Sequence, residues 1–450
     1  MSNPKKKVLY IAHGHPNFSR GGGELAAYYM YQSMKDHPEY EPYLLARLDD
    51  PNHQLSHPGT RLMASEKDDH THFLISNGAY NDYFFHSKIN SGLQEADMYQ
   101  AVREFVLALR PDVIHFHHYF HMGVDLISFV KSLLPNVRIL MTLHEYAAIC
   151  AHDGSMIKTD KKQLCHEASI ADCSRCFPTL SPAHFFLREK LFKSNFAVVD
   201  RFLAPSHFLQ SRYMEWGIEP ERISFMDYGR PIWTRRARPA KRKNQPFRVA
   251  FFGQIVYHKG WDVYLKSAIE YLRLRKQAAS RETAFPEIQF SIHGTRNFLS
   301  PELSDQLDSL IGQAGEALYV HGAYDPKHMQ DLMAGIDCIV VPSIWWENAP
   351  LVIQEAFMAG LPVICSNIGG MAEKVTDRVN GLHFRVGDHF DLLDRIMELA
   401  DSPELYSSLL EGIPSIYSDR QMAADLHDIY DQLIAKNENQ FHAAATSSHA

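Results

Sequence analysis

The chain has 450 residues and a net charge of −8 at pH 7, with 53 acidic against 45 basic side chains. This length predicts two domains of about 200 residues each, and the acidic balance argues against general nucleic-acid binding. No apolar run approaches the ~20 residues of a membrane span, and the polar start leads straight into a strand instead of a signal peptide. We therefore expect a cytoplasmic protein, with peripheral contact to the inner face of the membrane left open.

The apolar segment from Lys5 to Ala12 predicts a first strand, and a helix is expected to run from the glycines at 21–23 to about Lys35. This strand, loop and helix are typical of the first unit of a doubly wound α/β domain. The glycines do not fit Gly-x-Gly-x-x-Gly, which weakens a nicotinamide-binding interpretation. A plain turn that uses glycine for positive φ is the alternative.

Residues 50–100 carry few regular patterns and are expected to form a variable insertion. A further strand then ends in His115, His117 and His118. His115 and His117 share one strand face, so a metal pair is conceivable. Polar residues at a strand end are the favoured interpretation, because no acidic or cysteine partner follows at ligand spacing. No metal is predicted there.

The next strand, Arg138 to Leu143, ends at His144. Ligands bind at the carboxyl ends of the strands in α/β sheets, so this imidazole is a candidate catalytic group. A histidine that only satisfies hydrogen bonds within the fold is the alternative.

Four of the six cysteines lie within 27 residues, and two of them form a Cys-x-x-Cys pair. The four are Cys150, Cys165, Cys173 and Cys176. Such a cluster is compatible with structural zinc or an iron–sulfur cluster, and equally with a polar loop that buries its thiols. The helix expected at 182–199 is rich in aromatic and basic residues, and an ordinary core helix is favoured there over one that lies on a membrane.

A basic, proline-containing linker is predicted at 234–246. Beyond it, apolar strands alternate with helices, which predicts a second doubly wound sheet. These strands are expected at 248–252, 288–293, 318–321 and 336–341.

The most informative stretch of the chain is 342–365. It follows a buried strand, and its helix is marked by Pro350 in the first turn and Gly360 at the end. The free N–H groups at the start of such a helix form an anion site at the carboxyl edge of the sheet. Glu347 and Glu355 flank this site, and carboxylates accept hydrogen bonds from hydroxyls. The stretch therefore predicts a ligand with sugars on both sides of a diphosphate.

With the glycines and acids that follow it, this stretch resembles the C-terminal signature of glycosyltransferase family 4. The shared positions are Glu347, Glu355, Gly360 to Val363, Gly369, Gly370, Glu373, Asn380, Gly381, Gly387 and Asp388. The segment Thr142 to Glu145 and the loop Gly253 to Gly260 are similar to further motifs of that family. The resemblance covers roughly residues 6–435.

The resemblance implies the α/β fold called GT-B, in which two Rossmann-like doubly wound domains face a cleft. We expect an N-terminal acceptor domain over 1–233 and a C-terminal nucleotide-sugar donor domain over 247–417. A helix at about 418–436 is expected to pack back on the first domain. Residues 437–450 are expected to be a disordered tail.

The resemblance also implies an activity: transfer of a hexosyl unit, with retention, from a UDP- or GDP-linked sugar to a saccharide, lipid-linked or small-molecule acceptor, as in polysaccharide biosynthesis. The implied catalytic residues are His144, Lys259 and Glu347. The implied donor-binding residues are Gly22, Gly23, Gln254, Lys259, Asn348, Ala349, Pro350, Leu351, Val352 and Glu355. Gln254 stands where the family has an arginine, so one cation of the diphosphate site is missing. No cofactor is required for this chemistry.

Two alternatives stay open. One is another enzyme of the same fold, such as a nucleotide-sugar epimerase, which would convert the donor without an acceptor. The other is a non-catalytic protein that binds nucleotide-sugars, for which Gln254 is the only indication.

Overall fold

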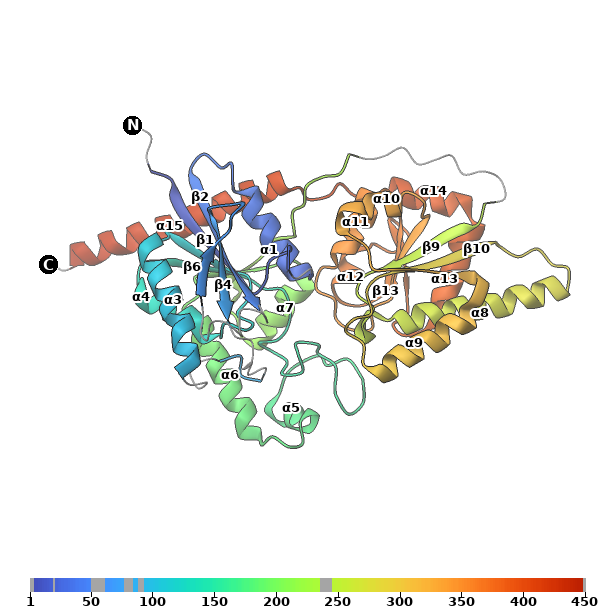
Figure 1. The fold of residues 1–450 in the computed structure, drawn as a ribbon, viewed down its shortest axis with the longest axis horizontal. Coiled ribbons are helices and arrows are strands. Elements are labelled where there is room, and N and C mark those ends of the chain that lie inside the picture. Colours follow the sequence, from blue (N-terminus) through green and yellow to red (C-terminus); the bar gives the residue numbers. More distant parts are fainter. Residues whose placement is uncertain are drawn as a thin grey trace. The chain divides into compact units, whose positions relative to one another are not determined.

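The computed structural model of the protein describes residues 4–18, 21–49, 61–76, 84–87, 93–234 and 245–447. The chain divides into two compact units (Figure 1). The N-terminal unit comprises Met1–Pro231 and Tyr417–Ala450, and the C-terminal unit comprises Ile232–Ile416. Most of the predicted linker, 235–244, lies outside the described residues. No described helix combines the length and the apolar character needed to cross a bilayer.

The N-terminal unit is built on an eight-stranded sheet with the order β3-β4-β2-β1-β5-β6-β7-β8. Its strands are β1 (Lys6–Ala12), β2 (Tyr40–Asp49), β3 (Arg61–Ala64), β4 (Thr71–Ser76), β5 (Val113–Phe116), β6 (Arg138–Thr142), β7 (Arg201–Ala204) and β8 (Ile223–Phe225). Neighbouring strands are parallel except β3 and β4, which pair antiparallel. Every residue of β5 and β6 is buried, as expected for strands of a parallel sheet covered on both faces.

The described part of 50–100, which carries few regular patterns in the sequence and was expected to form a variable insertion, contains regular structure. There, β3 pairs with β4, and β4 extends the sheet beside β2. These strands have only four and six residues, and so short a segment gives little periodic signal in the sequence.

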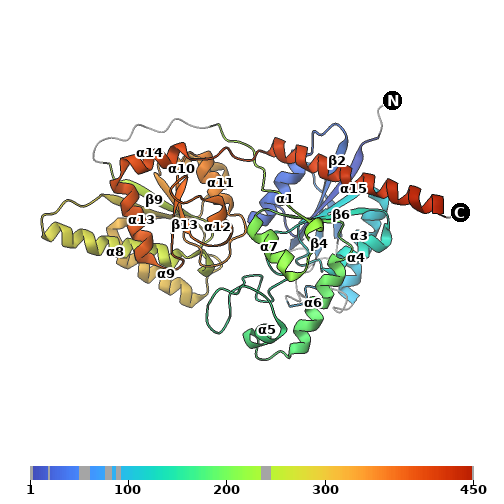
Figure 2. The ribbon, with the colours of Figure 1, turned by 180° about the vertical axis from the view of Figure 1, so that it is seen from behind.

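The helices of this unit include one that returns from the far end of the chain. They are α1 (Gly22–Ser33), α3 (Leu93–Leu109), α4 (Asp125–Leu133), α5 (Ile170–Cys176), α6 (Pro182–Phe196), α7 (His207–Trp216) and α15 (Asp419–Ser447). α15 packs against α1 (Figure 2). On α15, the Tyr430 hydroxyl lies 2.8 Å from the Tyr10 hydroxyl and 2.9 Å from His115 Nδ1. These buried contacts join α15 to the centre of the sheet.

The prediction of a disordered tail over 437–450 is wrong as far as Ser447, because α15 continues to that residue. The segment after Lys436 contains Glu438, Gln440 and three successive alanines. These are good helix formers, so the segment can extend a helix that is already nucleated by packing.

The C-terminal unit is built on a six-stranded parallel sheet with the order β11-β10-β9-β12-β13-β14. Its strands are β9 (Phe247–Phe252), β10 (Ile288–His293), β11 (Leu318–Gly322), β12 (Cys338–Val341), β13 (Val363–Ser366) and β14 (Gly381–Phe384). Along β9, side chains alternate between two cores: Val249 and Phe251 enter one, and Ala250 and Phe252 the other.

Helices cover both faces of this sheet (Figure 1). They are α8 (Trp261–Ser280), α9 (Pro301–Ala314), α10 (Met329–Met333), α11 (Leu351–Met358), α12 (Gly369–Lys374), α13 (His389–Asp401) and α14 (Pro403–Glu411). One core lies under α8, α9, α13 and α14, and the other under α10, α11 and α12. Both units therefore confirm the predicted class, two Rossmann-like doubly wound α/β domains.

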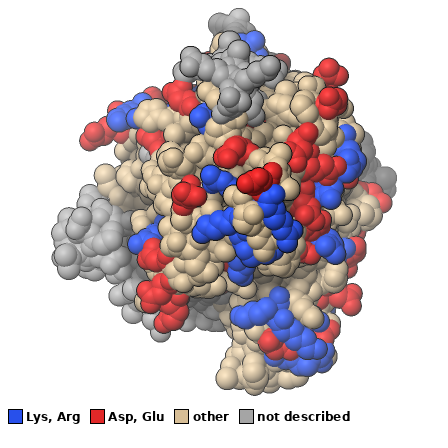
Figure 3. All heavy atoms as spheres, turned by 90° about the vertical axis from the view of Figure 1, so that its right-hand side faces the viewer, with Lys and Arg blue, Asp and Glu red and all other residues tan. Residues whose placement is uncertain are grey.

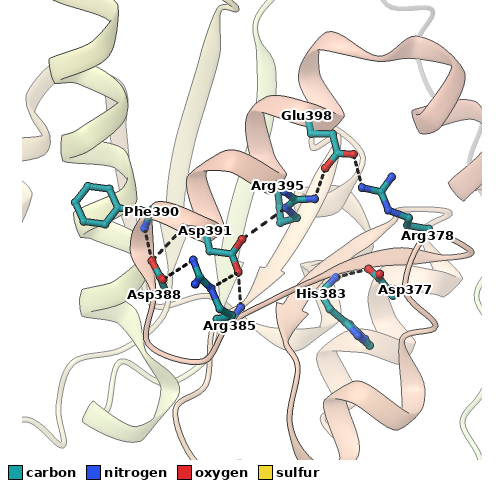
Figure 4. Close-up of polar contacts among 9 residues, drawn as sticks. All are labelled: Asp377, Arg378, His383, Arg385, Asp388, Phe390, Asp391, Arg395 and Glu398. Atoms are coloured by element: carbon teal, nitrogen blue, oxygen red, sulfur yellow. Dashed lines mark hydrogen bonds and ion pairs between the residues drawn. The ribbon is translucent and has the colours of Figure 1, made fainter.

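The signature pair Gly387 and Asp388 has a structural role in this unit. The Asp388 carboxylate accepts hydrogen bonds from the N–H groups of Phe390 at 3.0 Å and Asp391 at 3.1 Å, so it caps α13 (Figure 4). Arg385 pairs with Asp388 at 2.9 Å and with Asp391 at 3.3 Å. Gly387 has φ +76°, which favours glycine in the turn before the cap.

Charge on the surface is mixed. On the face drawn in Figure 3, Lys and Arg side chains are interspersed with Asp and Glu. Exposed ion pairs in the C-terminal unit include Arg273 with Glu270 and Arg296 with Asp308, each at 2.5 Å. Such pairs contribute little to stability.

Candidate functional site

The predicted site residues gather at equivalent points of the two sheets. In the C-terminal unit, β9 leads to β10 on one side and lies beside β12 on the other, so the strand order reverses between β9 and β12. In the N-terminal unit, the same reversal falls between β1 and β5. Ligands bind beyond the carboxyl ends of the strands at such reversals.

Backbone contacts hold the loop after β9 against the loop after β12. Gly260 has φ +69°, and a Cβ there would lie 1.9 Å from the Pro342 carbonyl oxygen, so only glycine fits. The Ile344 N–H donates to the His258 carbonyl at 2.9 Å. Lys259, between these two contacts, is therefore held against the loop that begins at Pro342.

Lys259 and Glu347 form an ion pair in this unit. Lys259 Nζ donates to Glu347 Oε1 at 2.6 Å, and Ser343 Oγ donates to the same oxygen at 2.7 Å. Burial of Glu347, which is 5% exposed, acts to raise the pKa of its carboxyl, but Lys259 and Ser343 outweigh burial and hold that pKa below its usual value. Glu347 is therefore an ionised acceptor for hydroxyls at neutral pH, beside a cation that suits a phosphate.

A glycine pair supports the Glu347 loop. The Gly370 N–H donates to the Glu347 carbonyl at 2.7 Å, and a Cβ on Gly370 would lie 1.6 Å from the Asn348 carbonyl oxygen. Gly369 has φ +58°. The Gly-Gly part of the signature thus lets α12 approach this loop more closely than any other residue would allow.

α11 begins directly after the loop. Pro350 precedes the first helical residue instead of lying in the first turn, and Asn348 and Ala349 before it are buried. Leu351 and Val352 form the start of the helix, where the positive end of the helix dipole favours an anion. The structure therefore brings Lys259, Glu347 and the predicted anion site together at one edge of the sheet.

Glu355 lies in the second turn of α11 and is 8% exposed. Burial, and then the charge of Glu355, raise the pKa of Tyr324, so this carboxylate is within electrostatic reach of that phenol. Tyr324 packs against Phe252 with ring centroids 5.6 Å apart, and Phe252 stacks on His293 at 4.1 Å. His321 continues this ring row, stacked on His293 at 4.1 Å. Flat rings suit a nucleobase, and the carboxylate suits ribose hydroxyls.

Gln254 is exposed at the start of the loop after β9 and brings no positive charge. The nearby His258, whose ring centroid lies 4.6 Å from that of Trp345, does not replace the missing cation. Burial and the charge of Lys259 lower the pKa of His258 to about 4, so it is neutral at neutral pH.

Four histidines meet at the reversal of the N-terminal sheet. They follow β1, β5 and β6, and they are His13, His117, His118 and His144. The rings of His13 and His118 are 4.1 Å apart, and His118 stacks on His144 at 4.8 Å. We call this group the histidine cluster.

His144 is oriented from both ring nitrogens. Its Nδ1 lies 2.6 Å from the Tyr228 hydroxyl, and its Nε2 lies 3.0 Å from His117 Nδ1. Burial, followed by the neighbouring His117 and His13, lowers the pKa of His144 well below its usual value. The ring is therefore neutral at neutral pH and offers hydrogen bonds without charge.

His115 is a structural histidine. It is fully buried, its Nε2 lies 2.7 Å from Thr142 Oγ1, and its Nδ1 lies 2.9 Å from the Tyr430 hydroxyl. Burial, and then the charge of His144, lowers the pKa of His115 to about 3. Both of its nitrogens are satisfied within the fold, which agrees with the favoured interpretation of polar residues at a strand end.

Gly22 and Gly23 open α1 beside the histidine cluster. A Cβ on Gly23 would lie 2.6 Å from His118 Nε2, so glycine lets the helix begin close to the imidazoles. Glu24 Oε1 lies 3.4 Å from His13 Nε2. The residues expected to bind the donor thus divide between the units: Gly22 and Gly23 belong to the N-terminal unit and the others to the C-terminal unit.

The four clustered cysteines lie in the N-terminal unit, and two of them are not in a loop. Cys173 and Cys176 are on α5, which Ser169 caps by accepting from the Asp172 N–H at 3.1 Å. The thiols of Cys150, Cys165, Cys173 and Cys176 line one pocket. All four are in the described part of the chain, and no three of their sulfurs lie within 4.8 Å of one another.

His13 and Tyr228 were not identified from the sequence as site residues, and His118 was noted only as a polar residue at a strand end. Position directly after a predicted strand is a signal that could have identified His13 and His118. Tyr228 lies 84 residues from its partner His144 and carries no local signal of that contact.

Two family models match the chain. The one described as Glycosyltransferase Family 4 matches residues 20–229, and the one described as Glycosyl transferases group 1 matches residues 233–414. The two matched ranges follow the division into an N-terminal and a C-terminal unit.

Curated relatives match parts of the chain. An uncharacterized glycosyltransferase of Methanocaldococcus jannaschii is 30% identical over 137 residues, 30% of each chain. The lipopolysaccharide core biosynthesis mannosyltransferase LpsB of Rhizobium meliloti is 24% identical over 196 residues, 41% of this chain and 52% of LpsB. Each of these matches spans less than two thirds of the relative's own length.

Solved structures match nearly the whole chain. Sucrose-phosphate synthase from Thermosynechococcus elongatus aligns with a TM-score of 0.68 at 17% identity, over 96% of this chain and 100% of that one. HepE from Anabaena, solved in complex with UDP and glucose, aligns with a TM-score of 0.61 at 15% identity, over 98% and 100%. At these identities the likeness shows the fold, which is that of GT-B enzymes. With two family models that together cover most of its length, the chain belongs to the family 4-type glycosyltransferases of the GT-B fold.

Proposed function

We propose that this protein transfers a hexosyl unit, with retention of configuration, from a nucleoside diphosphate sugar to a hydroxyl of a saccharide, lipid-linked or small-molecule acceptor. The observation that carries the proposal is the ion pair of Lys259 and Glu347 at the start of α11, 2.6 Å apart. It combines a cation for phosphate with an acceptor for hydroxyls at one edge of the sheet. HepE was solved with UDP and glucose, which makes UDP-linked hexoses the first donors to test and GDP-linked hexoses the second.

Each part of a nucleoside diphosphate sugar has a counterpart in the C-terminal unit. Lys259 and the first turn of α11 would hold the diphosphate. Glu347 would accept hydroxyls of the sugar, and Glu355 would accept those of the ribose. The ring row beside Glu355 would stack on the base. Because Gln254 is uncharged, Lys259 would neutralise more of the diphosphate charge than the equivalent lysine does in relatives with an arginine at the position of Gln254.

The proposed reaction is a displacement on one face of the sugar. The acceptor oxygen bonds to the anomeric carbon as the bond from that carbon to the diphosphate oxygen breaks, and the acceptor proton passes to the departing diphosphate. Negative charge grows on the diphosphate in the transition state, where Lys259 and the helix N-terminus stabilise it most. His144, oriented by Tyr228 and His117, would hydrogen-bond the transferred sugar. No metal and no covalent enzyme intermediate takes part.

The name of LpsB, a lipopolysaccharide core biosynthesis enzyme, supports a place in polysaccharide or glycoconjugate synthesis, and we propose that the protein works on the inner side of a membrane. We propose a saccharide or lipid-linked saccharide as the acceptor. Binding of the purified protein to vesicles that carry such an acceptor, but not to bare vesicles, would support this placement.

Incubation of the purified protein with UDP- and GDP-linked hexoses tests the proposal. Slow hydrolysis of one donor is expected without acceptor, and a glycoside with the donor's anomeric configuration is expected with one, by mass spectrometry and NMR. An inverted product contradicts retention. Conversion of the donor to an epimer without transfer indicates the epimerase alternative, and binding without any turnover indicates a non-catalytic protein.

A further inference from the structure

Three separate segments of the N-terminal unit bring four thiols to one pocket. Cys150 lies in the segment that follows β6. An antiparallel bridge closes a short turn, and Cys165 follows directly after it. Cys173 and Cys176 are three residues apart on α5, so they share one face of that helix. Nothing in the proposed transfer uses these side chains.

Four of the six residues of this pocket that carry metal-ligand atoms are cysteines. Its other walls are largely aliphatic and aromatic, and its volume of about 20 Å³ suits a single ion or water-sized guest. Two further residues with ligand atoms line the pocket, His152 and Asp172. His152 Nδ1 lies 3.0 Å from the Ile157 carbonyl, which leaves Nε2 of this ring for a metal, and the Asp172 carboxylate accepts from Ser169 Oγ at 2.8 Å. The Cys165 thiol also has a partner, since it donates to the Glu167 carbonyl at 3.1 Å.

Two cations stand near the thiols. Arg188 is within electrostatic reach of Cys173, and Lys158 is within electrostatic reach of Cys165. A coordinated thiol is deprotonated by its metal, and nearby cations stabilise the resulting thiolates.

We propose that Cys150, Cys165, Cys173 and Cys176 bind one structural zinc ion. Zinc takes four thiolates in a tetrahedron with Zn–S bonds of about 2.3 Å, which places the sulfurs about 3.8 Å from one another. The present spacing is wider, because no three of these sulfurs lie within 4.8 Å of one another. Binding therefore draws the four side chains inward around the pocket. Each thiol releases its proton to solvent as its sulfur binds, so affinity rises with pH.

The ion would stabilise the segment that follows His144. Arg188 on α6 donates to the carbonyls of Ala148 and Phe84, each at 2.7 Å, and so ties this segment to α6. α5 packs against α6 (Figure 1). A zinc ion that joins Cys150 to α5 would add a second tie between the same segment and this helix pair. Its role is structural and does not depend on the proposed reaction.

The metal content of untagged protein, purified without chelators from cells supplied with zinc, tests the proposal. We expect about one zinc ion per chain and loss of most of it in Cys150→Ser and Cys173→Ser, because each removes one ligand of four. Cys338→Ala and Cys365→Ala are the matched controls, since these free cysteines are buried in the other unit, and both should keep the zinc. Zinc retained by both serine variants overturns the proposal.

Alkylation of the wild-type protein gives a readout that does not depend on how the variants fold. The four thiols should resist iodoacetamide in the native protein and react after a chelator is added, as followed by mass spectrometry. Circular dichroism of each variant separates loss of metal from loss of structure. Metal-free wild-type protein with four reactive thiols, iron with sulfide in place of zinc, or disulfides between the four cysteines would each overturn the assignment.

Discussion

The two sheets reverse their strand order in the same way but present opposite chemistry at the reversal. In the C-terminal unit, the loops after β9 and β12 meet in a charged pair, Lys259 and Glu347. In the N-terminal unit, the loops after β1, β5 and β6 meet in the histidine cluster. Burial lowers the pKa of three of its members, His117, His118 and His144, well below the usual value, so they are neutral at neutral pH.

The strand order determines where on each sheet a ligand can bind. The side chains at that point determine which chemical group of the ligand can bind there. A diphosphate needs positive charge and helix-end donors, which the C-terminal unit supplies. Sugar hydroxyls need oriented neutral donors and acceptors, and His144 with its partners Tyr228 and His117 is of that kind. Under the proposed function, the same fold would serve two different recognition tasks in one chain.

Replacing Lys259, the cation of the C-terminal unit, should have the largest effect on activity. In Lys259→Ala we expect kcat to fall by about 100- to 1000-fold, because the lysine acts on charge that forms in the transition state. Glu347 would also be left buried without its cation, so the free energy of unfolding should fall by about 3–5 kcal/mol. Steady-state kinetics and urea unfolding measure the two effects. Lys276→Ala removes an exposed lysine on α8, and it should change neither. Equal losses in donor affinity and in turnover would argue against this role.

A buried carboxyl next to the histidine cluster should make stability depend on pH. Burial raises the pKa of Glu145 from 4.5 to about 7, against the opposing effects of the Ala147 N–H and Arg188. The resulting stability is fully present below pH 4.5 and is lost as pH rises through about 7, a total of about 3 kcal/mol.

Unfolding free energies of wild type and Glu145→Gln at pH 5 and pH 7.5 isolate this effect, because the histidines titrate alike in both proteins. The wild type should lose about 2 kcal/mol relative to the variant between the two pH values, since part of the total is lost below pH 5 and above pH 7.5. Parallel pH curves would mean that Glu145 titrates normally.

Removing the Glu355 carboxylate tests whether this residue binds the ribose hydroxyls. In Glu355→Ala we expect UDP to bind more weakly by about 1.5–3 kcal/mol, because the ribose hydroxyls lose a charged acceptor. Isothermal titration calorimetry measures this change. Glu404→Ala, which alters an exposed glutamate on α14, is the control. Unchanged UDP affinity in the Glu355 variant would contradict the ribose assignment.

The smallest effect is expected in the N-terminal unit. Tyr228→Phe removes the hydroxyl that lies 2.6 Å from His144 Nδ1, and a neutral hydrogen bond contributes about 1 kcal/mol. We expect kcat to fall about fivefold while UDP affinity stays the same, because Lys259, Glu355 and the ring row, which are proposed to hold the nucleotide, lie in the other unit. Tyr257→Phe, at an exposed tyrosine, serves as the control. A loss of UDP affinity in Tyr228→Phe would contradict the assignment of nucleotide binding to the C-terminal unit alone.

Prediction succeeded where the signal is local. The alternation of apolar segments with helices in both halves indicated two doubly wound sheets, and both are present. The placement of Glu347 before α11 and of Glu355 within it also follows from spacing along a single helix. Prediction failed for β3, β4 and α5, which have four, six and seven residues. Such short elements depend more on their neighbours in the sheet or on capping than on their own periodicity.

The fold class and the helix that begins at Leu351 could be predicted from the sequence, because hydrophobic period, caps and turn glycines act over a few residues. Which distant residues meet depends on how the whole chain packs. Lys259 and Glu347 are 88 residues apart in the chain, and His115 and Tyr430 are 315 apart. Such contacts follow from the order in which strands join a sheet and from the return of α15 to the first sheet. Local periodicity is the same for many strand orders, so the composition of each site emerges only when the whole chain is packed.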